Sequence, residues 1–535
     1  MKPLSRLLQA PALIPLQNRV YRGLWLAWLM ANMTMWIHDV TAGWRMVQLT
    51  DSTVMVALVQ TASTLPVFLL GIASGALADI VDRRRYFAAT QLWVCVTAVL
   101  LAGLELAGAL TAPLLLLLTF VNGIGLALRW PVFSAIVPEV LRREELPAGL
   151  ALSSISMNLS RIAGPLLAGA LLAMAAPALV FALNALLAGA GLWLILRWKS
   201  AQRASTLPGE RFLGAMRVGL QHVWQSPRMR VVVVRAFLFF LQSSALVALL
   251  PLIAHRTGGG AAMFTAMMAS MGAGAIVAAL QFPRWRQRFG RDAFVRYGTV
   301  AHALVSAGIV IVPTPWFALP AMALAGAAWI STANTLVMSA QLALPDWVRA
   351  RGMSIYQVAL MGGTAVGAWL WGHVADVSSV PAAVVAASVS GLAFLLLTLR
   401  HSVEQGGDED FTPRQARPAP AVAVDVKPDE GPVMVEVEYH IDPARAADFA
   451  EVMQATRCAR LRQGVLSWEL FRDTTQPGRY VEHFIDESWV AHHRWLERFS
   501  AADDMLRSQR LAFHLGDRPP RIRRYVAALA PSVER

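Results

Sequence analysis

Long apolar runs separated by short clusters of charge constrain this chain more than any other feature. The run from 53 to 77 carries no charged residue, and neither does the run from 86 to 104. Five charged residues, Asp79, Asp82 and Arg83 to Arg85, crowd between them. A helix needs about 20 apolar residues to cross the hydrocarbon core of a bilayer. Both runs are long enough, so the sequence predicts a polytopic membrane protein.

The composition supports a membrane protein and argues against a nucleic-acid-binding one. Of the 535 residues, 56% are hydrophobic and only 15% are charged, whereas about 25% of the residues of a soluble domain are charged. The net charge of +13 would suit a nucleic-acid partner. Most basic residues, however, flank apolar runs, where they orient helices in a bilayer. We therefore expect the lipid bilayer as a partner, and no nucleic acid.

Twelve apolar runs predict twelve membrane crossings. They lie near 23–48, 53–77, 86–106, 111–136, 149–173, 177–197, 231–253, 261–281, 297–313, 316–342, 353–374 and 381–399. The connections alternate between basic and nearly uncharged segments, which places both termini in the cytoplasm. An even number of crossings requires the same arrangement. We expect a multi-pass protein of a bacterial-type inner membrane.

The longest basic connection divides the crossings into two halves of six, and the halves repeat one another. Three glycines of the first half recur in the second at one constant spacing: Gly149, Gly164 and Gly169 correspond to Gly352, Gly367 and Gly372. Repeated halves are typical of transporters in which one bundle rocks against the other. Small residues also let membrane helices pack closely, but the constant spacing favours duplication.

The composition changes from apolar to polar after residue 400. We predict six segments: a cytoplasmic N-terminal segment (1–22), a first six-helix bundle (23–197), a central cytoplasmic loop (198–230), a second six-helix bundle (231–400), a linker (401–431) and a cytoplasmic α+β domain (432–535). Residues 433–441 alternate between apolar and polar, as in a half-buried strand. The predicted order of elements in the last segment, β-α-β-β-α-β with a break near Ser500, is ferredoxin-like.

Two ionisable residues, Asp39 and Arg45, lie near or inside the first crossing, with His38 beside Asp39. Ionisable groups are costly in a membrane, so their presence suggests a function. One hypothesis makes Asp39 the carboxylate that couples transport to protons. Arg45 is six residues further on and does not share a helical face with Asp39. In the alternative, Arg45 lies near the outer end and pairs with Asp51 or with lipid head groups.

Arg129 in the fourth crossing and Arg161 in the fifth have no acid close to them in the sequence. Asn158 lies one turn before Arg161, so both side chains can face one cavity. These arginines suit an anionic or catecholate-like substrate, through charge and stacking. Alternatively, they reach the membrane interface or pair with Asp39. Gly164-Pro165 follows, and a proline inside a helix predicts a bend there.

The charged cluster after the second crossing combines Gly75, Asp79, Asp82 and Arg83 to Arg85. It resembles the loop between helices 2 and 3 of the major facilitator superfamily of transporters, although Asp82 replaces the second glycine of that pattern. The resemblance implies a conformational latch, in which Asp79 meets the other half in one state only. Alternatively, the arginines only set the membrane topology.

Three further segments resemble the enterobactin-exporter-like branch of that superfamily, the transmembrane secretion effectors. They are Trp36 to Trp44, Thr50 to Gln60 and Leu65-Pro66. The resemblance implies a proton-coupled exporter of a siderophore, a drug or another small secondary metabolite. Uptake of a metabolite by the same fold is the first alternative, because a fold does not set the direction of transport.

The C-terminal segment resembles the antibiotic-biosynthesis monooxygenases, which pair into dimeric α+β barrels. This resemblance implies dimerisation, and a membrane-tethered enzyme is the second alternative function. The histidines of the segment do not favour a metal site, because His492 and His493 are adjacent on a helix and point apart. No carboxylate spacing completes a ligand set. We predict neither a metal nor a cofactor.

Overall fold

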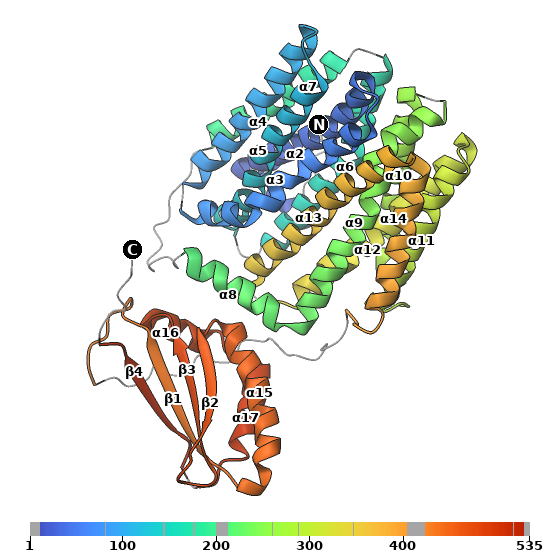
Figure 1. Ribbon diagram of the computed structural model, residues 1–535. Coiled ribbons are helices and arrows are strands. Elements are labelled where there is room, and N and C mark those ends of the chain that lie inside the picture. Colours follow the sequence, from blue (N-terminus) through green and yellow to red (C-terminus); the bar gives the residue numbers. More distant parts are fainter. Residues whose placement is uncertain are drawn as a thin grey trace. The chain divides into compact units, whose positions relative to one another are not determined.

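The computed structural model describes residues 11–80, 82–142, 145–174, 177–198, 212–258, 260–286, 288–345, 347–403, 423–516 and 518–528 (Figure 1). Its packing divides the chain into two compact units. The membrane unit comprises Met1–Pro208, Val232–Ser339 and Tyr356–Val403. The sheet unit comprises Gly209–Val231, Ala340–Ile355 and Glu404–Arg535.

Twelve long helices correspond to the twelve predicted crossings. They follow a short 3-10 helix, η1 (Pro11–Gln17), and are α2 (Arg19–Leu49), α3 (Thr53–Ile80), α4 (Arg83–Leu106), α5 (Ala112–Val140), α6 (Leu146–Met174), α7 (Pro177–Arg197), α9 (Pro227–Arg256), α10 (Gly260–Arg286), α11 (Arg291–Ile311), α12 (Pro315–Leu342), α13 (Arg349–Val377) and α14 (Val380–Thr398). Among the described residues, eleven helices are long and apolar enough to cross a membrane, and α2 is not one of them. The charged residues of α2, including Asp39 and Arg45, set it apart.

The predicted loop at 79–85 is wrong in its extent. Helix α3 continues through Gly75 and Asp79 to Ile80, and α4 begins at Arg83. Asp82 ends the connection, because its Oδ1 accepts a hydrogen bond from the backbone N–H of Arg85 at 2.8 Å. A carboxylate in this position satisfies an N–H group that the first turn of a helix leaves free. The charged cluster therefore belongs mostly to two helix ends.

The glycines that repeat in the sequence make equivalent contacts in the two halves, as duplication predicts. A Cβ atom at Gly149 would meet Leu141, and one at Gly352 would meet Leu344; a Cβ atom at Gly169 would meet Thr265, and one at Gly372 would meet Ala57. The last two contacts are reciprocal: the fifth helix of each half, α6 or α13, packs on the second helix of the other, α10 or α3. Small residues permit this close approach.

We predict that Gly372→Leu destabilises the membrane unit by about 1–3 kcal/mol, because the added side chain forces α13 away from Ala57. Gly103→Leu is the matched control, since no atom lies within 4 Å of a Cβ atom at Gly103. The melting temperatures of the two purified variants test this. Equal values would show that α3 and α13 are not tightly packed at this position.

The sheet unit contains a four-stranded antiparallel sheet of order β2-β3-β1-β4. Its elements are β1 (Val433–His440), η2 (Pro443–Arg445), α15 (Ala446–Gln463), β2 (Ser467–Arg472), β3 (Arg479–Asp486), α16 (Trp489–Glu497), α17 (Ala501–Leu511) and β4 (Arg521–Val526). The helices cover one face of the sheet (Figure 1). The predicted β-α-β-β-α-β order is confirmed, and so is the break near Ser500, whose side chain caps α17.

The central segment, predicted as a loop, contains helix α8 (Phe212–Gln225), which packs on the C-terminal domain. Gln221 donates a hydrogen bond to the carbonyl of Val465 at 2.9 Å, and His222 Nδ1 lies 3.2 Å from the carbonyl of Arg462. The pattern of α8 is amphipathic, and such a helix gains most of its stability from packing. The domain therefore includes a helix from a distant part of the sequence.

We predict that the sheet unit loses stability as the pH falls below about 6.5. Burial lowers the pKa of His222 to about 4, so the folded unit holds this histidine neutral while the unfolded chain takes up a proton. Between about pH 7 and pH 5 the loss amounts to roughly 2 kcal/mol.

Melting curves of wild type and His222→Gln over this pH range provide the measurement. The variant lacks the titrating group but retains a side-chain N–H donor, so its dependence on pH should be weaker. Identical slopes for the two proteins would contradict the prediction.

Candidate functional site

A stripe of aromatic and polar side chains runs along one face of α2. Trp28, Asn32, Trp36 and Asp39 follow one another at intervals of four, four and three residues, which places them on one side of a helix. Trp28 and Asn32 are buried. The stripe extends over about 16 Å at 1.5 Å per residue. Helix α2 packs against α3, α5, α6 and α7.

Arg129 of α5 is completely buried against this stripe. Its Cζ lies 5.5 Å from the centroid of the Trp28 ring. Neither its Nε nor its two Nη atoms have a hydrogen-bond partner among the described residues. A desolvated cation–π contact contributes about 2 kcal/mol. This contact alone leaves the hydrogen-bond donors of the guanidinium unsatisfied.

Arg161 of α6 lies between two indole rings that come from different halves of the membrane unit. Its Cζ is 5.6 Å from the Trp36 ring of α2 and 4.9 Å from the Trp329 ring of α12. Its buried Nε and Nη1 atoms lack hydrogen-bond partners within the described part of the chain. Gly164 lies one turn further on, where a Cβ atom would be 2.6 Å from Cβ of Trp36. The glycine therefore lets α6 bring Arg161 onto α2.

Asp39, at the other end of the stripe, accepts a hydrogen bond from Ser63 of α3, with 2.6 Å between Oγ and Oδ1. No ion pair joins Asp39 to a described cation, so the alternative in which Arg129 or Arg161 pairs with it does not occur in this structure. The neighbouring His38 is buried and lies 3.2 Å from the hydroxyl of Thr119. The carboxylate therefore has a hydroxyl, not a cation, as its described partner.

Arg45 does not belong to this stripe. Its Nε donates to Oε2 of Glu105 in α4 at 3.0 Å, and its Nη1 donates to Gln48 at 3.1 Å. The alternative in which Arg45 pairs with Asp51 does not occur in this structure, because Glu105 at the end of α4 takes that place. Arg45 therefore links α2 to α4 and is not aimed into the predicted cavity.

Several predicted site residues lie partly outside the described residues. Nothing is described of the side chains of Asn158 and Asp79, or of the surroundings of Gly75. Pro165 lies inside the continuous helix α6, and the bend stays a prediction. In the basic cluster, Arg84 Nη2 donates to the carbonyl of Leu196 at 2.7 Å and so joins the start of α4 to the end of α7.

Two polar clusters of the second half escaped the sequence analysis. Arg235 of α9 is buried; it pairs with Asp292 at 3.1 Å and donates to the carbonyl of Thr398 at 2.8 Å. Gln242 contacts the buried His302 at 3.2 Å. Arg235 and His302 are polar residues within apolar runs, and this could have marked them as noteworthy. Nothing local in the sequence, however, indicates that their partners are Asp292 and Gln242.

The carboxylate of Glu482 is completely buried in the core of the sheet unit. It accepts hydrogen bonds from Tyr439, Arg460 and Trp468, each at 3.0 Å. Burial alone would raise the pKa of Glu482, but the charges of Arg460 and Arg510 and the hydrogen bond from Trp468 hold that pKa below its usual value. Its oxygen atoms are thus occupied by neighbouring side chains.

The histidines of the sheet unit also have protein partners. His492 Nδ1 lies 2.8 Å from Oδ2 of Asp486, and its Nε2 accepts a hydrogen bond from Arg524 at 3.1 Å. His493 packs edge-on against Trp489. Among the described residues, no group of three or more histidine, cysteine or acidic side chains is placed to hold a metal ion.

The paired bundles of apolar helices, with buried charges at their centre, define a membrane transporter of the major facilitator class. The chain belongs to the transmembrane secretion effector family, whose model matches residues 10–532. The match includes the sheet domain as well as the membrane helices. No curated protein shows significant similarity to the chain.

Solved transporter structures share this fold. A point mutant of the nucleoside transporter NupG aligns with a TM-score of 0.59 and 12% identity over 71% of this chain and 99% of its own. A bacterial homologue of the human lysosomal transporter Spinster, inward-facing and occupied, gives 0.58 and 15% over 73% and 98%. A D-xylose–proton symporter gives 0.54 and 14% over 74% and 98%.

We predict that Arg129→Met leaves the stability of the purified protein unchanged or raises it. A buried guanidinium without an acidic partner costs free energy, and methionine keeps an apolar contact with Trp28. Arg235→Met is the matched control: it leaves Asp292 without its ion-pair partner and should cost about 3–5 kcal/mol. Melting temperatures in detergent measure both. A large loss of stability in Arg129→Met would mean that Arg129 has a structural role.

Proposed function

We propose that this protein is a proton-coupled exporter of a small, anionic aromatic molecule, such as a siderophore, a drug or another secondary metabolite. The observation that carries the proposal is the pair of arginines, Arg129 and Arg161, which lie on indole rings and have no described acidic partner. Groups that a protein keeps charged and incompletely bonded inside a membrane are typically there for a ligand.

The geometry suits a flat anion. Each guanidinium offers several N–H donors in a plane, which match a carboxylate or a catecholate. The rings of Trp36 and Trp329 offer aromatic surfaces beside Arg161. The amide of Asn32, which has no described hydrogen-bond partner, adds a donor and an acceptor on the same face of α2. Together these groups favour recognition of the substrate by its charge and by stacking on its ring, and not by its shape alone.

Asp39 is the group proposed to carry the proton. It lies three residues beyond Trp36 on the same face of α2, and its described partner is the hydroxyl of Ser63. A hydroxyl can donate to the ionised carboxylate and accept from the protonated one, so it stabilises both states. A guanidinium partner would favour only the ionised state.

We propose that transport proceeds by alternating access, and the contacts between the halves support this. Arg161 touches an indole ring from each half, so rocking of the bundles changes its surroundings. We propose both termini in the cytoplasm of a bacterial-type inner membrane, as the basic connections favour. Gly75, Asp79, Asp82 and Arg83 to Arg85 are proposed as the latch on that side. Dimerisation through the sheet domain stays a prediction.

Transport by the full-length protein in proteoliposomes tests the proposal, with a radiolabelled dihydroxybenzoate as the probe. We expect an imposed pH gradient to drive the probe against its concentration gradient. Asp39→Asn should abolish this accumulation but keep the exchange of labelled for unlabelled probe, which needs no net proton movement. Arg161→Gln should lose both activities.

Asp51→Asn is the control for the aspartate substitution, because Asp51 is exposed and lies outside the stripe. Accumulation by Asp39→Asn at the wild-type level would contradict the coupling role. Vesicles of opposite orientation separate export from uptake: if the proton gradient drives the probe toward the side that carries the C-terminal domain, the protein imports its substrate.

A further inference from the structure

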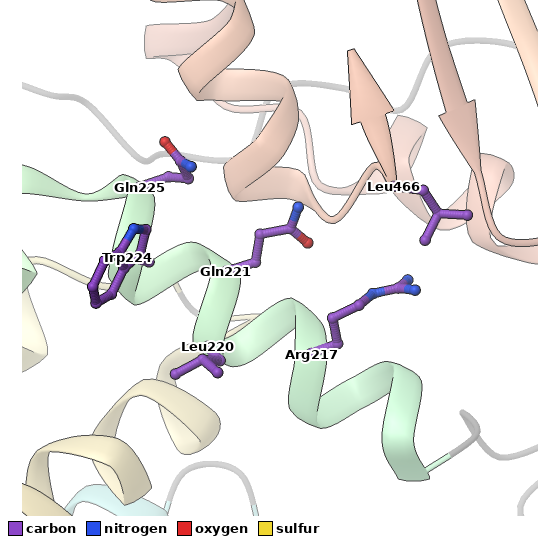
Figure 2. A pocket seen from close by; sticks show the side chains of 6 residues that line it. All are labelled: Arg217, Leu220, Gln221, Trp224, Gln225 and Leu466. Atoms are coloured by element: carbon purple, nitrogen blue, oxygen red, sulfur yellow. The ribbon is translucent and has the colours of Figure 1, made fainter.

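Helix α8 presents two chemically different faces. Gln221 and Arg217 extend toward the C-terminal domain, where Arg217 pairs with Glu487 at 2.8 Å (Figure 2). Leu220 and Trp224 lie four residues apart, on one side of the helix, and are 58% and 68% exposed. An exposed tryptophan and leucine together are unusual on a surface that faces only water.

The exposed side chains adjoin a surface pocket of about 370 Å³. The pocket is lined by Arg217, Leu220, Gln221, Trp224, Gln225 and Leu466 (Figure 2). Leu466 is itself 40% exposed. The apolar surface thus continues from α8 onto the C-terminal domain, with an arginine and two glutamines at its border.

The chain holds this face close to the membrane. Helix α8 ends at Gln225, and α9, one of the candidate membrane spans, begins at Pro227. Three residues span at most about 11 Å, so Trp224 lies within that distance of the start of a crossing. Helix α9 is about 45 Å long at 1.5 Å per residue, longer than the roughly 30 Å of hydrocarbon. Its ends therefore reach the head-group region.

The charge of this segment complements an anionic lipid surface. Residues 211–230 contain four arginines and no acidic residue, although one of the four, Arg217, is paired with Glu487 of the C-terminal domain. Arg230, at the beginning of α9, is exposed. Each basic residue near an anionic leaflet contributes about 1 kcal/mol of attraction, and tryptophan favours the boundary between head groups and acyl chains.

We propose that α8 lies on the anionic phospholipid surface of the leaflet that α9 enters, with Leu220 and Trp224 inserted at the boundary between head groups and acyl chains. The helix then has the membrane on one side and the C-terminal domain on the other. It anchors the domain at the lipid surface. This proposal does not depend on the substrate or on the direction of transport.

Spin-label accessibility in the full-length protein tests the proposal. Cys95→Ala and Cys458→Ser provide a background without native thiols, into which Leu220→Cys or Trp224→Cys is introduced. The control is Phe471→Cys, at a side chain of β2 that is similarly exposed, at 55%. The labelled proteins are placed in lipid nanodiscs of phosphatidylcholine, with or without phosphatidylglycerol. Collisions with oxygen report the acyl region, and collisions with a water-soluble nickel complex report water.

With phosphatidylglycerol present, we expect the labels at 220 and 224 to be accessible to oxygen and protected from nickel, and the label at 471 to be accessible to nickel. Arg230→Gln should lower the ratio of inserted to water-exposed label roughly fivefold, the equivalent of about 1 kcal/mol. Unchanged melting temperatures verify that the variants fold.

Two results would overturn the proposal. Labels at 220 and 224 that are as accessible to nickel as the label at 471 would show that this face lies in water. Protection that is independent of phosphatidylglycerol and accompanied by spin–spin broadening would show that a second copy of the chain covers the face.

Discussion

The burial of guanidinium groups against indole rings is the feature that distinguishes the centre of the membrane unit. Arginine is costly inside a membrane, and aromatic contacts offset only part of that cost. Around Arg161, the sequence provides Trp36 on α2, Trp329 on α12, and Gly164, which lets α6 approach α2. These features make a positive, aromatic centre inside the membrane unit, and the proposed anionic ligand would offset the remaining cost.

The other arginines of the membrane unit show what a structural role looks like. Arg45 has Glu105 as its partner, and Arg235 has Asp292. Asp292 also accepts hydrogen bonds from Ser402 and from the backbone N–H of Val403, so it ties the end of the second bundle to α11. In each case a carboxylate neutralises the guanidinium, and the pair joins segments that are distant in the sequence. Arg129 and Arg161 differ in having no described carboxylate partner, which is why we propose them, and not Arg45 or Arg235, as substrate-binding groups.

The sequence was sufficient to predict the elements whose signal is local. Apolar length predicted the membrane helices, and strict alternation predicted the strand at 433–441. It was not sufficient where a partner lies far away: Glu105 is 60 residues from Arg45, and Asp292 is 57 residues from Arg235. Helix α8 is short and is flanked by arginines, so its apolar pattern does not stand out from the basic connection around it. The predicted loop at 79–85 is longer than the connection in the structure. The sequence does not distinguish an aspartate that caps a helix, such as Asp82, from an aspartate in a loop.

The duplicated halves share their scaffold but not their charges. Glycines recur at one spacing and make reciprocal contacts between the halves. At the same spacing, the second half has Thr332 where the first has Arg129, and Thr364 where the first has Arg161. Each threonine donates a hydrogen bond to a carbonyl of its own helix, at 2.9 and 3.0 Å. At these two positions the second half therefore has a neutral, hydrogen-bonded side chain in place of a buried charge. The two halves therefore share the glycines that let their helices pack, whereas the residues proposed to bind an anion and a proton lie in the first half. The second bundle contributes Trp329 to Arg161, so the charged centre still depends on how the two halves meet.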